Sequence, residues 1–148
     1  MIKFDTPAST VLEVLERGRG LVANPRTFCK GNYGIGVPNG RRVAVGRLSD
    51  VARDGIERVC SLGAVVAARG ANDDVAARAI SRLDRAAFDL FGLDSSIYMV
   101  NDRRSRADRL AMWDRAIELE RESRPDLVQI EELKPITPAQ WNILTKQS

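Results

Sequence analysis

The chain has 148 residues, 44% hydrophobic and 29% charged with a net charge of +3, which is typical of a single globular domain. It contains no histidine and only two cysteines, which excludes serine–histidine or cysteine–histidine catalysis and histidine-containing or four-cysteine metal sites. The longest central apolar run, residues 64–68, is too short to cross a bilayer, and the first residues lack a secretory signal, so we expect a cytoplasmic protein.

The first predicted helix begins at the start of the chain. Thr6 is a suitable N-cap, and Pro7 occupies the first helical position, where proline is tolerated best. Apolar residues recur at helical spacing over residues 11–15. We expect Gly18 or Gly20 to end this helix.

Residues 33–45 are predicted to form a β-hairpin around the turn signal at residues 38–40. A two-residue Asn-Gly turn would scatter the large apolar side chains over both faces of the hairpin. We therefore predict a three-residue loop with Gly40 in the left-handed conformation and Ile35 opposite Val43. The other face, rich in glycine, is open to close approach by a helix or a ligand.

The chain is predicted to be helical almost continuously from Ser49. This residue caps a helix that ends at Gly70 and carries Cys60 on its apolar face. Asn72 caps the next predicted helix, which Gly92 ends.

Residues 96–100 form a short extended run that we interpret as a strand. Asn101 and Asp102 are then interpreted as a turn, because such side chains often bond to nearby backbone. The turn leads into a helix that Ser105 caps and that ends before Pro125.

The predicted fold is α+β: a mostly helical single domain with about four main helices, one β-hairpin and a short C-terminal helical tail. The globular domain spans residues 1–125, and the tail spans residues 126–148. Trp141 in the tail either docks on its own domain, the commoner arrangement, or is offered to a partner.

Several segments together resemble a known family: residues 28–33, residues 59–64 with the pattern Cys-x-Leu-Gly-Ala, residues 97–102 with Asn-Asp, and a helix ending at residues 113–118. In order and spacing they resemble a bacterial and phage family, the domain of unknown function 6197, over residues 8–120. That family often has an aromatic residue where this chain has Val59 and Val100. The resemblance implies that these segments converge in space, and it implies no activity.

Cys29 is the strongest enzymatic candidate, because neighbouring Lys30 and Arg26 favour a thiolate. Without a base to take its proton, its commoner role is that of a small buried hydrophobic residue. We expect both cysteines to be free thiols, with a single Cys29–Cys60 bridge as the alternative. The glycines of residues 31–36 open a hairpin rather than a helix, which excludes a phosphate-binding loop.

Residues 1–70 carry 11 Lys and Arg against 6 Asp and Glu, and 19 of the 23 basic residues are arginine. This bias has two interpretations. Arginine can form bidentate hydrogen bonds with phosphate, which would suit a nucleic-acid-binding protein. A GC-rich genome would give the same bias, and the basic residues form no concentrated patch in the sequence.

We therefore expect a non-enzymatic binding or accessory protein of bacterial or phage origin that recognises a protein or a small anionic ligand and self-associates. The alternatives are a nucleic-acid-binding protein that uses the Arg-rich N-terminal half and an enzyme dependent on Cys29 or Asp102. No catalytic residue, metal ligand, cofactor or membrane partner is assigned. The candidate binding residues are Cys29, Asn32, Tyr33, Arg41, Arg42, Asn101, Asp102, Arg103 and Trp141.

Overall fold

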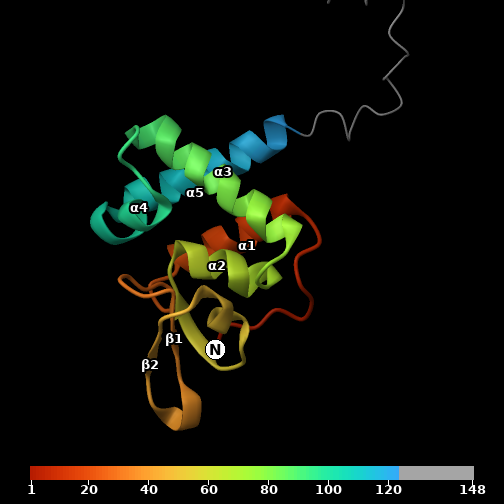
Figure 1. Cartoon of the computed structure of the whole chain (residues 1–148), viewed down its shortest axis with the longest axis vertical. Helices are drawn as coiled ribbons and strands as arrows, with labels where there is room; N and C mark the ends of the chain where they lie inside the picture. The colour runs from red at the N-terminus through yellow and green to blue at the C-terminus, as the bar shows by residue number, and fades with distance from the viewer. Residues whose placement is uncertain (124–148) are drawn as a thin grey trace, which may run out of the picture.

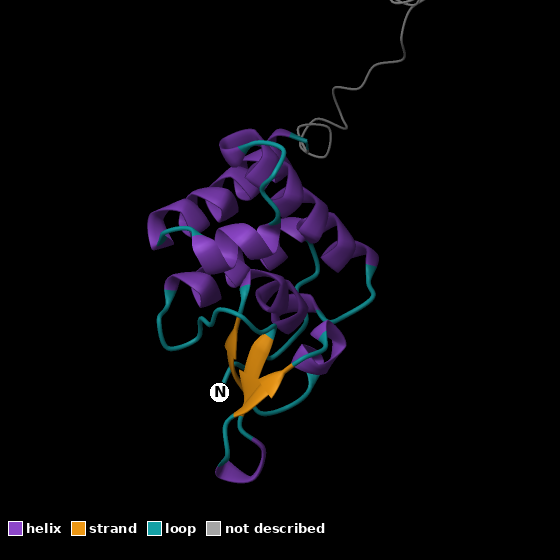
Figure 2. Cartoon of the chain, turned by 60° about the vertical axis from the view of Figure 1, so that its left-hand side comes forward, coloured by secondary structure: helices purple, strands orange, loops and turns teal. Residues whose placement is uncertain are grey.

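The computed structural model of the protein describes residues 1–123, in which helices pack together above a small sheet (Figures 1 and 2). The helices are α1 (Val11–Ala23), α2 (Ser61–Arg69), α3 (Asp74–Phe91), α4 (Ile97–Arg103) and α5 (Arg106–Glu122). The antiparallel sheet has the order β2-β1-β3, with β1 (Gly34–Gly36), β2 (Val43–Val45) and β3 (Ile56–Val59). Two 3-10 turns are η1 (Pro38–Gly40) and η2 (Leu48–Ala52). The predicted mostly helical α+β class is confirmed.

Helix α1 begins later and ends later than the sequence predicted. Its N-cap is Thr10, whose hydroxyl accepts a hydrogen bond from the backbone N–H of Glu13 at 3.1 Å. The helix continues through Gly18 and Gly20 to Ala23. Packing of α1 between α2 and α5 outweighs the cost of about 1 kcal/mol that a glycine imposes inside a helix.

Gly18 allows α1 to approach α5 closely. The indole ring of Trp113 on α5 is fully buried and lies directly against Gly18. A Cβ atom at residue 18 would overlap this ring, whereas one at Gly20 would meet nothing within 4 Å. Gly18, which was expected to end the helix, therefore lies inside it, where the packing of Trp113 requires a residue without a side chain.

The hairpin register predicted from the sequence is wrong by one residue. Ile35 pairs with Ala44, and the Arg41 N–H donates to the Pro38 carbonyl at 3.0 Å. Asn39 and Gly40 have φ angles of 53° and 76°, so they form the two-residue left-handed turn that we rejected. The prediction failed because β1 is the central strand and its glycine face is the buried one.

The glycine face of β1 does admit close packing, as predicted. A Cβ atom at Gly34 would lie 2.9 Å from the Arg58 carbonyl oxygen and 3.5 Å from Val51 of η2. Val43 on the edge strand β2 lies opposite Gly36 on this face and is 50% exposed, so the buried part of the face does not extend to the outer end of β2.

The predicted single helix from Ser49 to Gly70 is also wrong. The chain forms η2, turns at Gly55 with a φ of 87°, and adds β3 to the free edge of β1. Helix α2 starts only after Cys60 and ends at Gly70 as expected. The Asp-Gly pair before β3 was the turn signal that the helical pattern obscured.

Residues 97–100 are helical rather than extended, and Ser96 is the N-cap. The Ser96 hydroxyl accepts from the Met99 N–H at 3.4 Å and caps α4. The buried residues Ile97, Val100 and Asn101 follow helical spacing, and this spacing extends beyond the five residues that were interpreted as a strand.

Other helix ends agree with the sequence to within a residue. Asp73 caps α3 one position after the expected Asn72, and Gly92 follows its last turn. Ser105 caps α5, as predicted. In the described part of the chain, no helix is both long enough and apolar enough to cross a membrane. The predicted tail, with Trp141, lies outside the described residues.

We expect Gly18→Ala to lower the free energy of unfolding by about 1–3 kcal/mol, because the added methyl group forces the Trp113 ring or α1 to move. Gly20→Ala is the matched control and should raise this free energy by about 0.5–1 kcal/mol, because alanine favours the helix. Urea denaturation measures both. Equal effects of the two substitutions would contradict the packing of Gly18 against Trp113.

Candidate functional site

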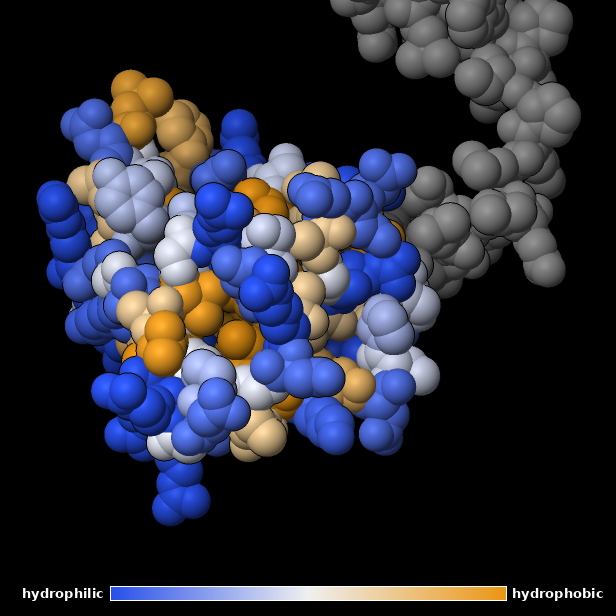
Figure 3. All heavy atoms as spheres, turned by 60° about the horizontal axis from the view of Figure 1, so that its bottom comes forward, coloured by the Kyte–Doolittle hydropathy of each residue, from blue (hydrophilic) through white to orange (hydrophobic). Residues whose placement is uncertain are grey.

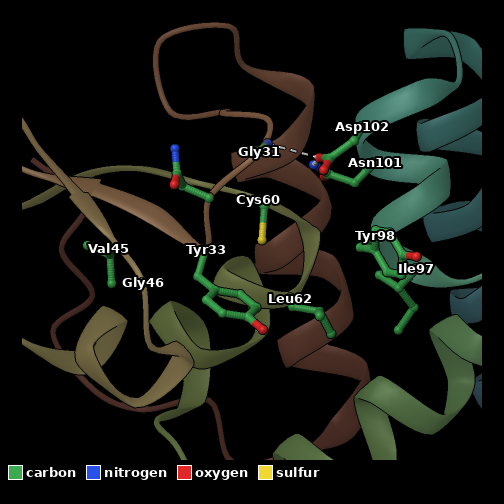
Figure 4. A pocket seen from close by; sticks show the side chains of 11 residues that line it. Gly31, Tyr33, Val45, Gly46, Cys60, Leu62, Ile97, Tyr98, Asn101 and Asp102 are labelled. Carbon is green, nitrogen blue, oxygen red and sulfur yellow. Dashed lines mark hydrogen bonds between the residues drawn. The ribbon is translucent and has the colours of Figure 1, made fainter.

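A cleft of about 270 Å³ opens where α4, the start of α2, the loop before β1 and the end of β2 meet (Figure 4). Its walls combine apolar, aromatic, amide and carboxylate groups. The lining residues are Gly31, Asn32, Tyr33, Val45, Gly46, Cys60, Leu62, Ile97, Tyr98, Asn101 and Asp102.

The side-chain amide of Asn101 joins the elements around the cleft. Its Oδ1 accepts hydrogen bonds from the N–H and the hydroxyl of Ser61, both at 2.8 Å. Its Nδ2 donates to the Cys29 carbonyl at 3.2 Å and to Asp102 Oδ1 at 2.8 Å. Asn101 is 1% exposed, so these bonds satisfy a polar group that would otherwise be costly to bury.

Ser61 connects this amide to the helical core. The indole Nε1–H of Trp113 donates to Ser61 Oγ at 3.2 Å, and Ser61 is itself fully buried. The Ser61 hydroxyl thus accepts from Trp113 and donates to Asn101. The resulting chain of bonds runs from α5 through α2 to α4.

Asp102 holds the loop before β1 against α4. Its Oδ1 accepts from the backbone N–H of Gly31 at 3.1 Å as well as from Asn101 (Figure 4). Gly31 has a φ of 79°, a left-handed conformation that favours glycine. The carboxylate is therefore fixed in orientation at the edge of the cleft.

The other side of the loop contacts the start of α2. The Cys60 N–H donates to the Tyr33 carbonyl at 3.0 Å, and the absence of a side chain at Gly63 leaves room for this carbonyl. Cys60 is the N-cap of α2, where its sulfur accepts from the Gly63 N–H at 3.4 Å. The prediction that Cys60 lies on the apolar face within a helix is corrected accordingly.

Arg109 supports the same region from below the cleft. Its guanidinium donates to the Arg104 carbonyl at 2.9 Å and to the Asn101 carbonyl at 3.3 Å, at the end of α4. It also lies 4.3 Å from the ring centroid of Phe28, at the start of the loop. Burial, followed by repulsion from Arg106, lowers the pKa of Arg109.

Both cysteines are buried free thiols. Burial, followed by repulsion from Cys60 and Asp102, raises the pKa of Cys29 from 9.0 to about 12, although Arg58 partly opposes this. Burial also raises the pKa of Cys60, against hydrogen bonds from Gly63 and Leu62. Neither sulfur is a thiolate at neutral pH, which is the form a nucleophilic cysteine requires.

The structure brings together four of the nine predicted site residues as cleft lining: Asn32, Tyr33, Asn101 and Asp102. Cys29 lies just behind them, with its sulfur 3.6 Å from the Asn32 carbonyl. Asn101 and Asp102 belong to α4, so their interpretation as a turn is wrong.

Three predicted arginines do not line this cleft. Arg41 and Arg42 lie at the hairpin, where Arg42 forms an ion pair with Glu57 at 3.1 Å. Arg103 ends α4 outside the lining. Trp141 lies beyond residues 1–123.

Sequence reasoning missed Ser61, Leu62, Ile97, Tyr98 and Trp113 as residues of the site or its support. A serine within an apolar helix start is the one signal that could have identified Ser61. The convergence of residues 28–33, 59–64, 97–102 and 113–118, which the family resemblance implied, is confirmed by the bonds of Asn101 and Ser61.

Comparison with known protein families gives a match to most of the chain. The profile of a family described as "Family of unknown function (DUF6197)" matches residues 6–119. No curated protein and no solved structure is significantly similar to the chain. Among residues 1–123, no three His, Cys, Asp or Glu side chains are grouped to hold a metal ion.

We expect thiol labelling of the native protein to be slow. At pH 8 the raised pKa of Cys29 reduces its thiolate fraction roughly a thousandfold relative to an ordinary thiol. Labelling rates with a disulfide reagent should rise about tenfold per pH unit up to about pH 12 in the Cys60→Ala variant. A rate that levels off near pH 9 or below would contradict the buried thiol and favour a reactive one.

The same shift predicts how stability depends on pH. The pKa of Cys29 is higher in the folded protein than in the unfolded chain. The contribution of the protonated thiol to the free energy of unfolding is therefore complete below pH 9 and is lost as the pH rises through about 12.

Substitution of Asn101 tests the network directly. Asn101→Leu keeps the branched shape of the side chain but leaves the Ser61 N–H and the Cys29 carbonyl without partners. We expect a loss of at least about 3 kcal/mol in the free energy of unfolding, because each unpaired buried group costs about 1–3 kcal/mol. Asn32→Ala, in the exposed part of the same cleft, should change it by less than about 0.5 kcal/mol. A small effect of Asn101→Leu would contradict the network.

Proposed function

We propose that this chain, which belongs to the DUF6197 family of unknown function, is a non-enzymatic binding protein that receives its ligand in the cleft beside Asn101. The observation that carries the proposal is the Asn101 network, which fixes the walls of the cleft through hydrogen bonds among four segments of the chain. A preformed concave site of this kind reduces the ordering cost of binding.

The chemistry of the lining supports binding rather than catalysis. Cys60 is protonated at neutral pH, and Asp102 already accepts two hydrogen bonds. Catalysis would need a second group placed to exchange protons with a substrate beside one of them. Besides amides and apolar groups, the described lining offers the phenols of Tyr33 and Tyr98 for that role, and neither phenol is hydrogen-bonded to Asp102 or Cys60 within residues 1–123.

The proposal places the protein in the cytoplasm of a bacterium or a phage-infected cell, as an accessory protein that self-associates. Free buried thiols support a reducing compartment. Phe88, Leu90 and Leu93, near the end of α3, are 42–88% exposed and would provide apolar area for contact between copies.

Nucleic-acid binding is the second candidate function. It is supported by arginines around the sheet that form no ion pair with any described residue. Most arginines on α1, α3 and α5 form ion pairs with carboxylates, for example Arg82 with Glu120 at 2.9 Å. Within residues 1–123, no ion pair involves Arg26, Arg41 or Arg47, which belong to the loops and hairpin around the sheet. Figure 3 views this end of the molecule, where hydrophilic side chains surround a smaller apolar centre. Affinity for DNA or RNA that falls steeply with salt would favour this candidate.

Native mass spectrometry of the freshly purified protein tests the proposed binding function. We expect an excess mass that disappears on denaturation and is lost in Gly46→Leu, which adds a side chain beside the cleft where a Cβ meets no atom within 4 Å. Gly46→Ala is the control and should retain the ligand. A ligand retained equally by Gly46→Leu would contradict the assignment of the cleft.

A clean multiple of the chain mass with nothing bound would instead favour protein recognition through self-association or a host partner.

A further inference from the structure

We propose that the cleft selects a cation, namely an ammonium or guanidinium group on an apolar or aromatic stem, and binds it through the free oxygen of Asp102. This inference rests on the proposed binding function and specifies its ligand class. It departs from the anionic ligand expected from the sequence, because the lining described above carries a negative charge.

Asp102 is the only charged side chain among the described residues that line the cleft. The two arginines that follow it in sequence do not neutralise it there. Arg103 is outside the lining, and the Arg104 guanidinium lies 4.0 Å from the centroid of the Phe91 ring and 3.4 Å from Asp108. The Arg109 guanidinium is attracted to Asp102, but it donates to the carbonyls of Arg104 and Asn101, and within the described residues it forms no ion pair with Asp102. An anionic ligand would therefore meet a carboxylate that has no ion-pair partner in that part of the chain and that repels it.

The Asp102 carboxylate is prepared for one further donor. Both of its hydrogen bonds, from Gly31 and Asn101, go to Oδ1. Within the described part of the chain, Oδ2 accepts no hydrogen bond and joins no ion pair. Because a carboxylate can accept about four hydrogen bonds, a cationic donor can add to Oδ2 without breaking the contacts that orient the group.

Two phenol rings line the same cleft as this carboxylate, Tyr33 on the side of the loop before β1 and Tyr98 on α4 (Figure 4). Tyr33 is 36% exposed and Tyr98 is 57% exposed, so both rings are accessible from solvent. The face of a tyrosine ring attracts a cation. Leu62 and Ile97 contribute apolar surface for an uncharged stem. The cleft thus offers a carboxylate and aromatic rings to the cationic group of such a ligand and an apolar surface to its stem.

The start of α2 would also favour an anion, but three of its backbone N–H donors are occupied. The Ser61 N–H bonds to Asn101, the Gly63 N–H bonds to the Cys60 sulfur, and the Ala64 N–H bonds to the Cys60 carbonyl. An anion at this helix start would have to replace those partners.

The cleft volume limits the ligand to a small amine or to one side chain. At about 270 Å³ it lies near the lower end of small-molecule sites. The same chemistry can come from a free amine or from a lysine or arginine side chain of a partner protein.

Three probes with the same ring and different charge test the inference: benzylamine, benzyl alcohol and benzoate. Titrations followed by the NMR shifts of the Gly31 amide and the Asn101 side-chain amide report binding at the cleft. We expect benzylamine to bind at least about tenfold more tightly than the other two, as for a hydrogen bond between charged groups.

Asp102→Asn is the matched variant, because asparagine retains an oxygen that can accept from Gly31 and Asn101 while the charge is removed. It should abolish the preference for benzylamine. Asp5→Asn makes the same change at an exposed position outside the cleft and should leave the preference intact. A preference that survives Asp102→Asn overturns the inference.

The remaining outcomes separate the inference from the proposed function. Equal binding of all three probes, or tighter binding of benzoate, overturns the cation site while leaving a ligand-binding cleft. No binding of any probe at 10 mM, roughly the weakest affinity of interest, overturns both. A lysine-containing peptide that binds more tightly than benzylamine, and loses its affinity when the lysine is acetylated, would identify a protein side chain as the source of the cation.

Discussion

The buried side-chain amide of Asn101 is the constraint on which the candidate site depends. It bonds to donors and acceptors from α2, α4 and the loop before β1, and without it the Ser61 N–H and the Cys29 carbonyl would be unpaired. Buried networks of this kind are stable only when every member is satisfied, so they tolerate few alternative arrangements. The position of Asp102, and with it the charge of the cleft, follows from the position of this amide.

Core packing and the site are coupled through Trp113. Its ring lies against α1 because residue 18 is a glycine, and this placement lets the indole N–H reach Ser61. A change within the helical core would therefore alter the start of α2 and the cleft beyond it. The sheet contributes in a different way: buried glycines of β1 allow η2 and β3 to approach, which sets the loop that ends at Tyr33.

Features with a local cause could be predicted from the sequence. The serine cap of α5, the glycine after α3 and the hairpin at residues 33–45 depend on neighbours in the chain. The register of the hairpin, the strand β3 and the helix α4 depend on distant partners: Ile35 lies opposite both Ala44 and Arg58, and α4 is held by residues of α2 and α5. The proximity of the candidate residues in segments 28–33 and 97–102 was predicted only from the family resemblance. Ser61 and Trp113 were missed because one hydroxyl and one indole N–H have no recognisable spacing.

The most direct test of this account is the solvent exchange of the Asn101 side-chain amide protons, measured by NMR at neutral pH. The exposed side-chain amide of Asn32 provides the comparison in the same cleft. If the Asn101 network fixes the cleft, its amide protons exchange only when the domain opens and are protected by several orders of magnitude relative to those of Asn32. Exchange at the rate of Asn32 would show that the amide is not held, and would contradict the central role of Asn101.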